Sequence, residues 1–241
     1  IIILYLICNP KNQIYINRKV KFEIDGAMIK KILHIGIPNG LENGLFQLGR
    51  VLVVSIIAGF GTVQIAANAV ANNIDSIGCI PGQAINLAMI TVIGQCVGAG
   101  DYNQAEYYTK KLMKIAYAFT SSINAIILCV LPILLFVYHL SDETLELAKI
   151  LIWIHCGCAI ILWPASFTLP NALRAANDVK FTMITAILSM WIFRIGISYI
   201  LGKEMGIGAI GVWIGMIMDW IFRIICFVWR YNSGKWKLHK V

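Results

Sequence analysis

Residues 115–138 read IAYAFTSSINAIILCVLPILLFVY, a run of 24 residues without a charged side chain. Residues 150–173, ILIWIHCGCAIILWPASFTLPNAL, form a second such run, in which His155 is the one basic side chain. A helix needs about 20 mostly apolar residues to cross the hydrocarbon core of a bilayer. These two stretches therefore decide the fold class, because each is long enough to be a transmembrane helix.

The composition of the whole chain agrees with this interpretation. Of its 241 residues, 59% are apolar and 13% are charged, whereas a typical soluble domain has about 25% charged residues. Disorder and collagen-like fibres are excluded by the same figures. The seven cysteines are odd in number and lie mostly in apolar stretches, so we expect them to pack as small apolar side chains and not to form a disulfide framework.

Four further apolar segments bring the number of expected spans to six. The sequence therefore predicts an all-α integral membrane protein, a bundle of six transmembrane helices. Residues 1–8 are apolar but too short to span a bilayer, and we interpret them as the remnant of a preceding transmembrane helix. We expect residues 9–31 to be a cytoplasmic linker, residues 32–230 the six-helix bundle and residues 231–241 a basic tail. The four further segments are residues 33–59, 66–97, 181–201 and 207–229.

The positions of the basic residues predict how the spans are oriented. If the spans alternate, fifteen of the 20 lysines and arginines lie on one side, and only Lys149 and Lys203 lie on the other. Cytoplasmic loops carry such an excess, so we expect a multi-pass protein of the plasma membrane with both ends in the cytoplasm. The net charge of +8 then reflects orientation, and we expect no nucleic-acid partner. The basic segments are residues 9–31, 98–114, 172–180 (which includes Arg174) and 230–241.

Six aspartate, glutamate or arginine side chains lie inside the expected spans, where charges are costly unless they face a partner or a cavity. In the first span, at about 100° per residue, a polar stripe covers one arc of the helix. This stripe either forms interhelical hydrogen bonds or lines a solvated cavity in which Glu42 titrates, and we expect the cavity. The ionisable residues are Glu42, Arg50, Asp75, Arg194, Asp219 and Arg223, and the stripe consists of Asn39, Glu42, Asn43, Gln47 and Arg50.

The second span has a similar stripe, which includes Asn68, Asn72 and Asp75. Pro81 and Gly82 interrupt this span, and a proline inside a helix removes a backbone hydrogen bond. Interrupted helices beside polar groups often mark binding sites in transporters. Pro81 and Gly82 are therefore either a hinge beside a site or a kink that serves packing alone.

In the last span, Asp219 and Arg223 have the i, i+4 spacing of a helical ion pair. Arg194 lies at a similar depth in the preceding span, so these three form either a neutralising structural cluster or part of a proton or ion relay.

The pair Cys156 and Cys158, next to His155, suggests metal ligands. On a helix, however, the two thiols point about 200° apart, so we expect no metal site. A nucleotide-binding loop and a paired nucleophile and base are absent from the sequence. We therefore expect neither an enzyme nor a cofactor.

Two polar segments outside the spans allow a coarse interpretation. Residues 101–114, DYNQAEYYTKKLMK, are either an amphipathic helix on the membrane surface or the capped start of an ordinary helix at Asp101. In the basic tail, Tyr231 and Trp236 alternate with lysines and an arginine. This pattern is typical of an anchor at an anionic cytoplasmic leaflet.

Three stretches resemble the second half of bacterial MATE (multidrug and toxic compound extrusion) transporters. They are IGIPNGLENGLFQLGR (residues 35–50), AANAVANNIDSIGCIPGQAINLAMITVIGQCVGAGD (66–101) and GVWIGMIMDWIFRIICFVWRYNSGKW (211–236). The resemblance covers about residues 1–238. It implies one lobe of a twelve-helix transporter, with helices seven to twelve in this chain and the end of helix six in residues 1–8. Residues 9–31 would then link the two lobes, and the N-terminal six-helix lobe would be missing.

The resemblance implies a secondary-active antiporter that exports cationic or amphipathic drugs while Na⁺ or H⁺ enters. Glu42 and Asp75 would bind the cation or the substrate, and the asparagines and glutamine of the two stripes would supply polar contacts. In one branch of the family, the cation-binding acid follows the first proline of helix seven by about eight residues. That position is Phe46 here, whereas Glu42 follows Pro38 by four.

Other functions remain open. A lipid-linked oligosaccharide flippase of the same superfamily would favour a cleft lined by arginine or lysine. A membrane-embedded enzyme or assembly subunit would use the basic cytoplasmic face. A truncated fragment would have no function without its N-terminal lobe, and its polar stripes would be half of an interface.

Overall fold

The computed structural model describes residues 25–238, without the side chains of Lys31, Ile35, Asn39 and Leu238. The chain divides into two units, residues 1–36 and residues 37–241. Of the first unit only the start of one helix is described, so the predicted remnant at residues 1–8 and residues 9–24 of the predicted linker lie outside the described residues. The second unit holds every candidate site residue whose side chain is described.

Within residues 25–238, all regular structure is helical, and six stretches are long and apolar enough to cross a membrane. This confirms the predicted all-α fold with six spans. Four of the stretches are single helices, and the other two run over neighbouring helical segments. In chain order the stretches are α2 (Gly26–Ala58), α3 (Thr62–Gly98), α4 (Tyr102–Phe136), Asp142–Ala175, Val179–Glu204 and α8 (Ala209–Asn232).

Several helices begin earlier than their apolar cores. The side chain of Asp25 accepts hydrogen bonds from the backbone N–H groups of Ala27 (2.8 Å) and Met28 (3.2 Å), which caps α2. Residues 26–31 of the predicted linker are therefore helical. Asp101 caps α4 in the same way, through the N–H of Gln104 at 2.9 Å. The alternative of a capped start at Asp101 is thus confirmed, and a separate surface helix over residues 101–114 is wrong.

The fourth and fifth stretches contain wider helical turns that the sequence analysis did not anticipate. The fourth consists of α5 (Asp142–Trp163), a π-helical turn η1 (Pro164–Thr168) and α6 (Leu169–Ala175). Because Pro164 has no N–H to donate, the regular ladder is interrupted there. The fifth consists of α7 (Val179–Ser189) and two π-helical segments, η2 (Met190–Ile197) and η3 (Ile200–Glu204).

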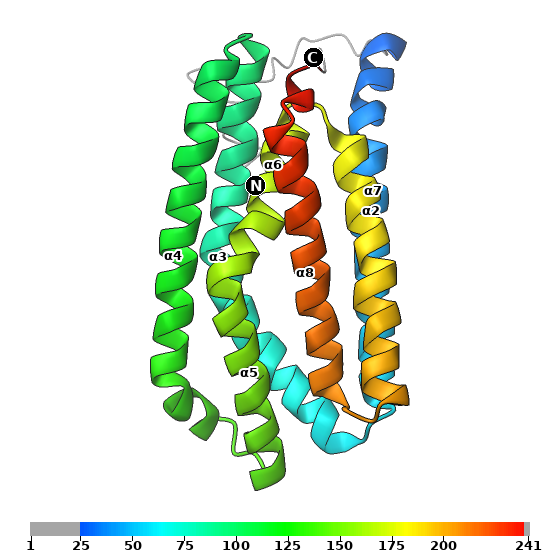
Figure 1. Cartoon of the computed structure of the whole chain (residues 1–241), viewed down its shortest axis with the longest axis vertical. Helices are drawn as coiled ribbons and strands as arrows, with labels where there is room; N and C mark the ends of the chain where they lie inside the picture. Colours follow the sequence, from blue (N-terminus) through cyan, green and yellow to red (C-terminus); the bar gives the residue numbers. More distant parts are fainter. Residues whose placement is uncertain (1–24, 239–241) are drawn as a thin grey trace, which may run out of the picture. The chain divides into compact units, whose positions relative to one another are not determined.

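In the second unit, α3 packs against α4 and α5, and α8 packs against α5 on one side and against α7 and η2 on the other (Figure 1). A buried apolar cluster joins α3, α5 and α8 and includes Ile74, Leu151 and Trp213. Large apolar side chains such as Ile133 and Phe136 on α4 are exposed. An apolar outer surface is what a helix bundle needs when lipid, and not water, surrounds it.

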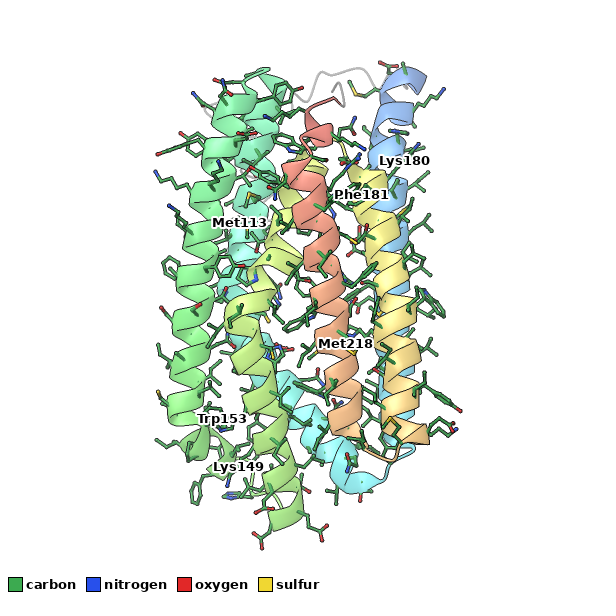
Figure 2. All side chains as sticks on the ribbon, viewed as in Figure 1. Met113, Lys149, Trp153, Lys180, Phe181 and Met218 are labelled. Atoms are coloured by element: carbon green, nitrogen blue, oxygen red, sulfur yellow. The ribbon has the colours of Figure 1, made fainter. Side chains whose placement is uncertain are left out.

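Basic side chains near the helix ends agree with alternating spans within the second unit. Figure 2 shows Lys149 and Trp153 on α5 near one end of the bundle, while Lys180 and Phe181 at the start of α7 lie near the other end. The sequence analysis assigned these two lysines to opposite sides. The relative placement of the two lysines is therefore as predicted, and the side of the membrane on which each lies stays a prediction.

The basic tail folds back onto its own bundle. After α8, a short 3₁₀ helix η4 (Lys235–Leu238) brings the ring of Trp236 parallel to that of Tyr231, with 5.5 Å between centroids. Trp236 is 2% exposed, and Lys237 Nζ lies 2.5 Å from Glu106 Oε1 on α4. Trp236 is therefore buried against protein, and anchoring of the basic tail at an anionic leaflet stays a prediction.

Candidate functional site

The Asp219 cluster is the most buried charged group of the described residues. The Asp219 side chain, on α8, is 0% exposed, and its Oδ1 accepts from Arg223 Nε one turn later at 2.9 Å. Ser189, at the end of α7, donates to Asp219 and accepts from Arg223 Nε at 2.8 Å. The hydroxyl thus joins both members of the ion pair across two helices. The sequence analysis missed Ser189, because a lone serine in an apolar run carries no signal of a charged partner.

Arg194 reaches the same cluster from η2. Its Nη1 lies 3.9 Å from Asp219 Oδ2, which is longer than a direct hydrogen bond. The ring of Phe46 on α2 lies 5.6 Å from the guanidinium carbon of Arg194 and 5.5 Å from that of Arg223, within the range of a cation–π contact. Asp219, Arg223 and Arg194 are therefore brought together as expected, and Phe46 contacts both arginines. Whether the cluster is structural or a relay stays a prediction.

Glu42 is paired with an arginine that the sequence analysis placed in a loop. Arg174 lies in α6, where its Nη1 donates to Asn171 Oδ1 at 2.8 Å and its Nη2 donates to Glu42 Oε1. The Glu42 side chain is 11% exposed, and the gap beside it, next to Phe46, has no room for a water molecule. Interhelical bonding therefore accounts for Glu42 within the described residues, and a solvated cavity at this residue stays a prediction.

The rest of the α2 stripe is not gathered into a site by the described residues. Asn43, Gln47 and Arg50 are exposed on α2, and the side chain of Asn39 lies outside the described part of the chain. A cavity of about 620 Å³ lies at the other end of α2, and its lining includes Ser55, Gln64, Tyr199 and Lys203 but none of the predicted site residues. The binding roles of Asn39, Asn43 and Gln47 stay predictions.

Two asparagines of α3 were expected to contact a ligand. In the structure both form hydrogen bonds with protein groups. Asn68 is buried, and its Oδ1 accepts from the indole N–H of Trp213 on α8 at 3.0 Å. Asn72 Nδ2 donates to the backbone carbonyl of Asn68 at 2.8 Å. Asn68 therefore connects α3 to α8, and its oxygen is already engaged. Their roles in binding a substrate stay predictions.

Asp75 has a partner of a different kind. Its Oδ1 accepts from the thiol of Cys79 at 3.1 Å and lies 2.8 Å from Nε2 of His155 on α5. The sequence analysis compared His155 with Cys156 and Cys158 on its own helix. The structure places His155 against Asp75 and Cys79 of α3 instead, and one signal of this was available, because Asp75 and Cys79 have the i, i+4 spacing of one helix face.

Gly82, in the predicted hinge, lies against an aromatic ring. A methyl group placed on Gly82 would overlap Cζ3 of Trp163, so this ring occupies the space beside the backbone. Pro81 lies inside α3, which continues without a break from Thr62 to Gly98. The close approach of Trp163 supports packing as one role of this Pro-Gly pair, and its role as a hinge stays a prediction.

The three acids of the spans thus differ in the partners that hold them. Glu42 and Asp219 each face arginine side chains, whereas the basic partner of Asp75 is a histidine. The Asp75 side chain is 24% exposed, compared with 11% for Glu42 and 0% for Asp219. Asp75 is therefore the most exposed of the three acids, and its ion pair among the described residues is with a histidine and not an arginine.

Comparisons with known proteins agree with this arrangement. Residues 38–200 match the model of the MatE family. A probable multidrug resistance protein NorM of Thermotoga maritima is 26% identical over 212 residues, which cover 88% of this chain and 46% of that protein. An uncharacterized transporter, YisQ, of Bacillus subtilis is 28% identical over 239 residues, which cover 98% of this chain and 52% of the relative.

A solved structure shares the fold. It is an outward-facing conformation of a multidrug resistance MATE family transporter of the MOP superfamily, with a TM-score of 0.86 and 20% sequence identity. The match covers 98% of this chain and 53% of that one. The chain therefore spans about half the length of the proteins that it matches.

Proposed function

Because this chain belongs to the MatE family of transporters, we propose that it forms one six-helix lobe of a secondary-active antiporter, a transporter and not an enzyme. The proposed antiporter exports cationic or amphipathic drugs in exchange for Na⁺ or H⁺. One observation carries this proposal: three carboxylates, Glu42, Asp75 and Asp219, lie among helices that can span a membrane, each close to a basic side chain. Ionisable side chains at such positions mark ion and substrate pathways.

In this proposal the cation competes with protein groups for a carboxylate. At Asp75 the competitor is the imidazole of His155, whose Nε2 lies 2.8 Å from the carboxylate. At Glu42 the competitor is Arg174, so binding there requires the ion pair between α2 and α6 to open. A ligand shifts a conformational equilibrium by its difference in affinity for the two states. Exchange of partners at Glu42 would therefore favour a state in which α2 is released from α6.

The remaining parts of the proposal concern the setting of the lobe. We propose that the protein lies in the bacterial plasma membrane with the Lys180 end of the bundle in the cytoplasm. The partner of the lobe is an N-terminal lobe of six further helices, which agrees with the half-length coverage of the relatives. No organic cofactor is needed, because an ion gradient supplies the energy.

Efflux from a drug-sensitive bacterial host tests the function. The first half of the Bacillus subtilis relative is fused to this chain, and retention of the cationic dye ethidium is measured with and without the fusion. We expect the fusion to lower retention, and Asp75→Asn and Glu42→Gln each to abolish this effect. Asp142→Asn is the matched control, because Asp142 is an exposed carboxylate in the first turn of α5. Equal retention with the fusion and with an empty vector, at normal membrane expression, would contradict the proposal.

A second candidate is the flipping of a lipid-linked oligosaccharide, and the arginines of the second unit favour it. Arg174, Arg194 and Arg223 lie within 4.0 Å of Glu42 or Asp219, so positive side chains accompany these two carboxylates. A positively lined path suits a phosphate-bearing lipid. Translocation of a fluorescent diphosphate lipid by the same fusion in proteoliposomes, without export of ethidium, would select this candidate.

A further inference from the structure

We propose that Asp75, Cys79 and His155 form a binding site for a divalent transition-metal ion of the Zn²⁺ type. The site does not depend on the proposed transport activity. Asp75 and Cys79 come from one face of α3 and His155 comes from α5. One donor atom of each residue, a carboxylate oxygen, a thiol sulfur and an imidazole nitrogen, lies within 4.8 Å of the other two.

The three donors converge on one point. The Cys79 sulfur is 3.1 Å from Asp75 Oδ1, and Nε2 of His155 is 2.8 Å from the same oxygen. These atoms belong to two helices that pack against each other, so the arrangement does not rest on a loop. An ion that takes one atom from each residue would therefore need small side-chain movements and no change in the fold.

His155 is buried and already directed at the carboxylate of Asp75. The residue is 1% exposed, its Nε2 lies 2.8 Å from Asp75 Oδ1, and its Nδ1 has no hydrogen-bond partner among the described residues. A bound cation would draw on Nε2 and the carboxylate oxygen together, since both would then present lone pairs to it.

Two aromatic rings hold the imidazole in this orientation. The rings of Trp213 and Trp220, both on α8, lie 5.6 Å and 5.2 Å from the His155 ring and nearly perpendicular to it. Perpendicular contacts of this kind are a favoured geometry for aromatic pairs. The histidine is therefore positioned by packing before any ion arrives, which lowers the cost of ordering a ligand.

The donor set selects the class of ion. Zn²⁺ and similar ions bind thiolate sulfur and imidazole nitrogen together with carboxylate oxygen, whereas hard cations such as Ca²⁺ take oxygen ligands. When the ion binds, the S–H bond of Cys79 breaks and its proton leaves to solvent, while His155 binds through the lone pair of its imidazole and Asp75 binds as a carboxylate. The charge of the ion is then balanced by one thiolate and one carboxylate, so the complex is neutral in an apolar interior.

Co²⁺ binding to the purified 241-residue chain in detergent tests the site, because a cobalt–thiolate bond gives a charge-transfer absorption in the near ultraviolet. We expect this band in the unmodified chain, its displacement by Zn²⁺, and release of one proton per ion. Cys79→Ser should remove the band. Asp75→Asn and His155→Gln should weaken binding by more than about 100-fold, because outer-shell partners alone are worth 10–100-fold.

Cys96→Ala is the matched control, because Cys96 is a second buried thiol on α3 that is not part of the cluster. This variant should keep the band, and helical circular dichroism should be equal for all variants compared. Zn²⁺ should also raise the melting temperature of the unmodified chain and of Cys96→Ala, but not that of Cys79→Ser. Absence of the band in the folded unmodified chain, or its persistence in Cys79→Ser, would overturn the proposal.

Discussion

The buried ion pair of Asp219 and Arg223 allows a quantitative prediction for Asp219→Asn. Asparagine has nearly the shape of aspartate and can still accept from Ser189, so the substitution removes the charge and little else. Arg223 is 3% exposed and would lose its one charged partner at hydrogen-bond distance among the described residues. Breaking a buried pair by removing one member costs about 3–5 kcal/mol, and we expect a loss in the free energy of unfolding within this range.

The cost of breaking this buried pair can be compared with the cost of breaking an exposed ion pair. Glu106 and Lys237 are 36% and 35% exposed, and exposed pairs contribute about 0–1 kcal/mol. Glu106→Gln should therefore change the free energy of unfolding by no more than about 1 kcal/mol. Unfolding is measured in mixed micelles of a mild detergent and dodecyl sulfate by circular dichroism at helical wavelengths.

A double substitution tests the physical reason. Asp219→Leu with Arg223→Met removes both charges and fills similar volume, and such apolar replacements of buried pairs are often neutral. We expect the double variant to be more stable than Asp219→Asn, with Arg194 accounting for any remaining loss. The reasoning would be refuted if Asp219→Asn cost no more than Glu106→Gln. It would also be refuted if the double variant lost as much stability as Asp219→Leu and Arg223→Met lose separately and in sum.

Three further predictions concern contacts between helices, each measured by the same unfolding assay. Gly82→Ala should cost about 1–3 kcal/mol by overpacking against Trp163. Gly94→Ala on the same helix has open space for the added Cβ and should be neutral or stabilise by up to about 1 kcal/mol. Equal changes in stability for the two variants would contradict the close contact of Gly82 with Trp163. Asn68→Leu should cost about 1–3 kcal/mol by leaving the Trp213 indole N–H unpaired, and adding Trp213→Phe should recover part of this loss; an unchanged loss would refute the hydrogen bond. Arg230→Lys should cost about 1.5–3 kcal/mol, because lysine cannot reproduce the bidentate pair that Arg230 Nε and Nη2 form with Asp178 at 2.6 Å and 3.1 Å. Lys180→Arg at an exposed position is the control, and an equal loss of stability in both variants would count against that pair.

The fold was largely predictable because membrane spans follow from local properties. A run such as residues 115–138 needs no knowledge of its neighbours to be recognised as a span, since its length and lack of charge suffice. The ends of the helices were less predictable. α2 and α4 continue beyond their apolar cores into polar turns, and the caps at Asp25 and Asp101 set their starts. Hydropathy detects the bilayer-spanning part of a helix, and caps determine where the helix itself begins.

The candidate site was predictable on each helix but not between helices. Helical periodicity placed Asp219 and Arg223 on one face correctly, because i and i+4 are neighbours in any α-helix. It could not find the pairing of Glu42 with Arg174, which are 132 residues apart, or that of Asn68 with Trp213, which are 145 residues apart. Such pairs depend on how helices pack, and a single sequence shows no packing.

Charge balance alone would have reduced the number of possible partners for each acid in the spans, without a structure. A carboxylate inside a span must face a cation, a polar cavity or a proton donor, so Glu42, Asp75 and Asp219 each require a partner within the bundle. Arg223 is assigned to Asp219 by its spacing, which leaves Glu42 and Asp75 to be matched with the other basic side chains near the spans.

Arg174 directly follows the apolar run of residues 150–173, and a long guanidinium side chain there can reach back into the bundle. His155 is the one basic group in the middle of that run, which makes it the natural partner for an acid at the depth of Asp75. Arg174 was expected to lie in a loop, and its pairing with Glu42 was therefore missed.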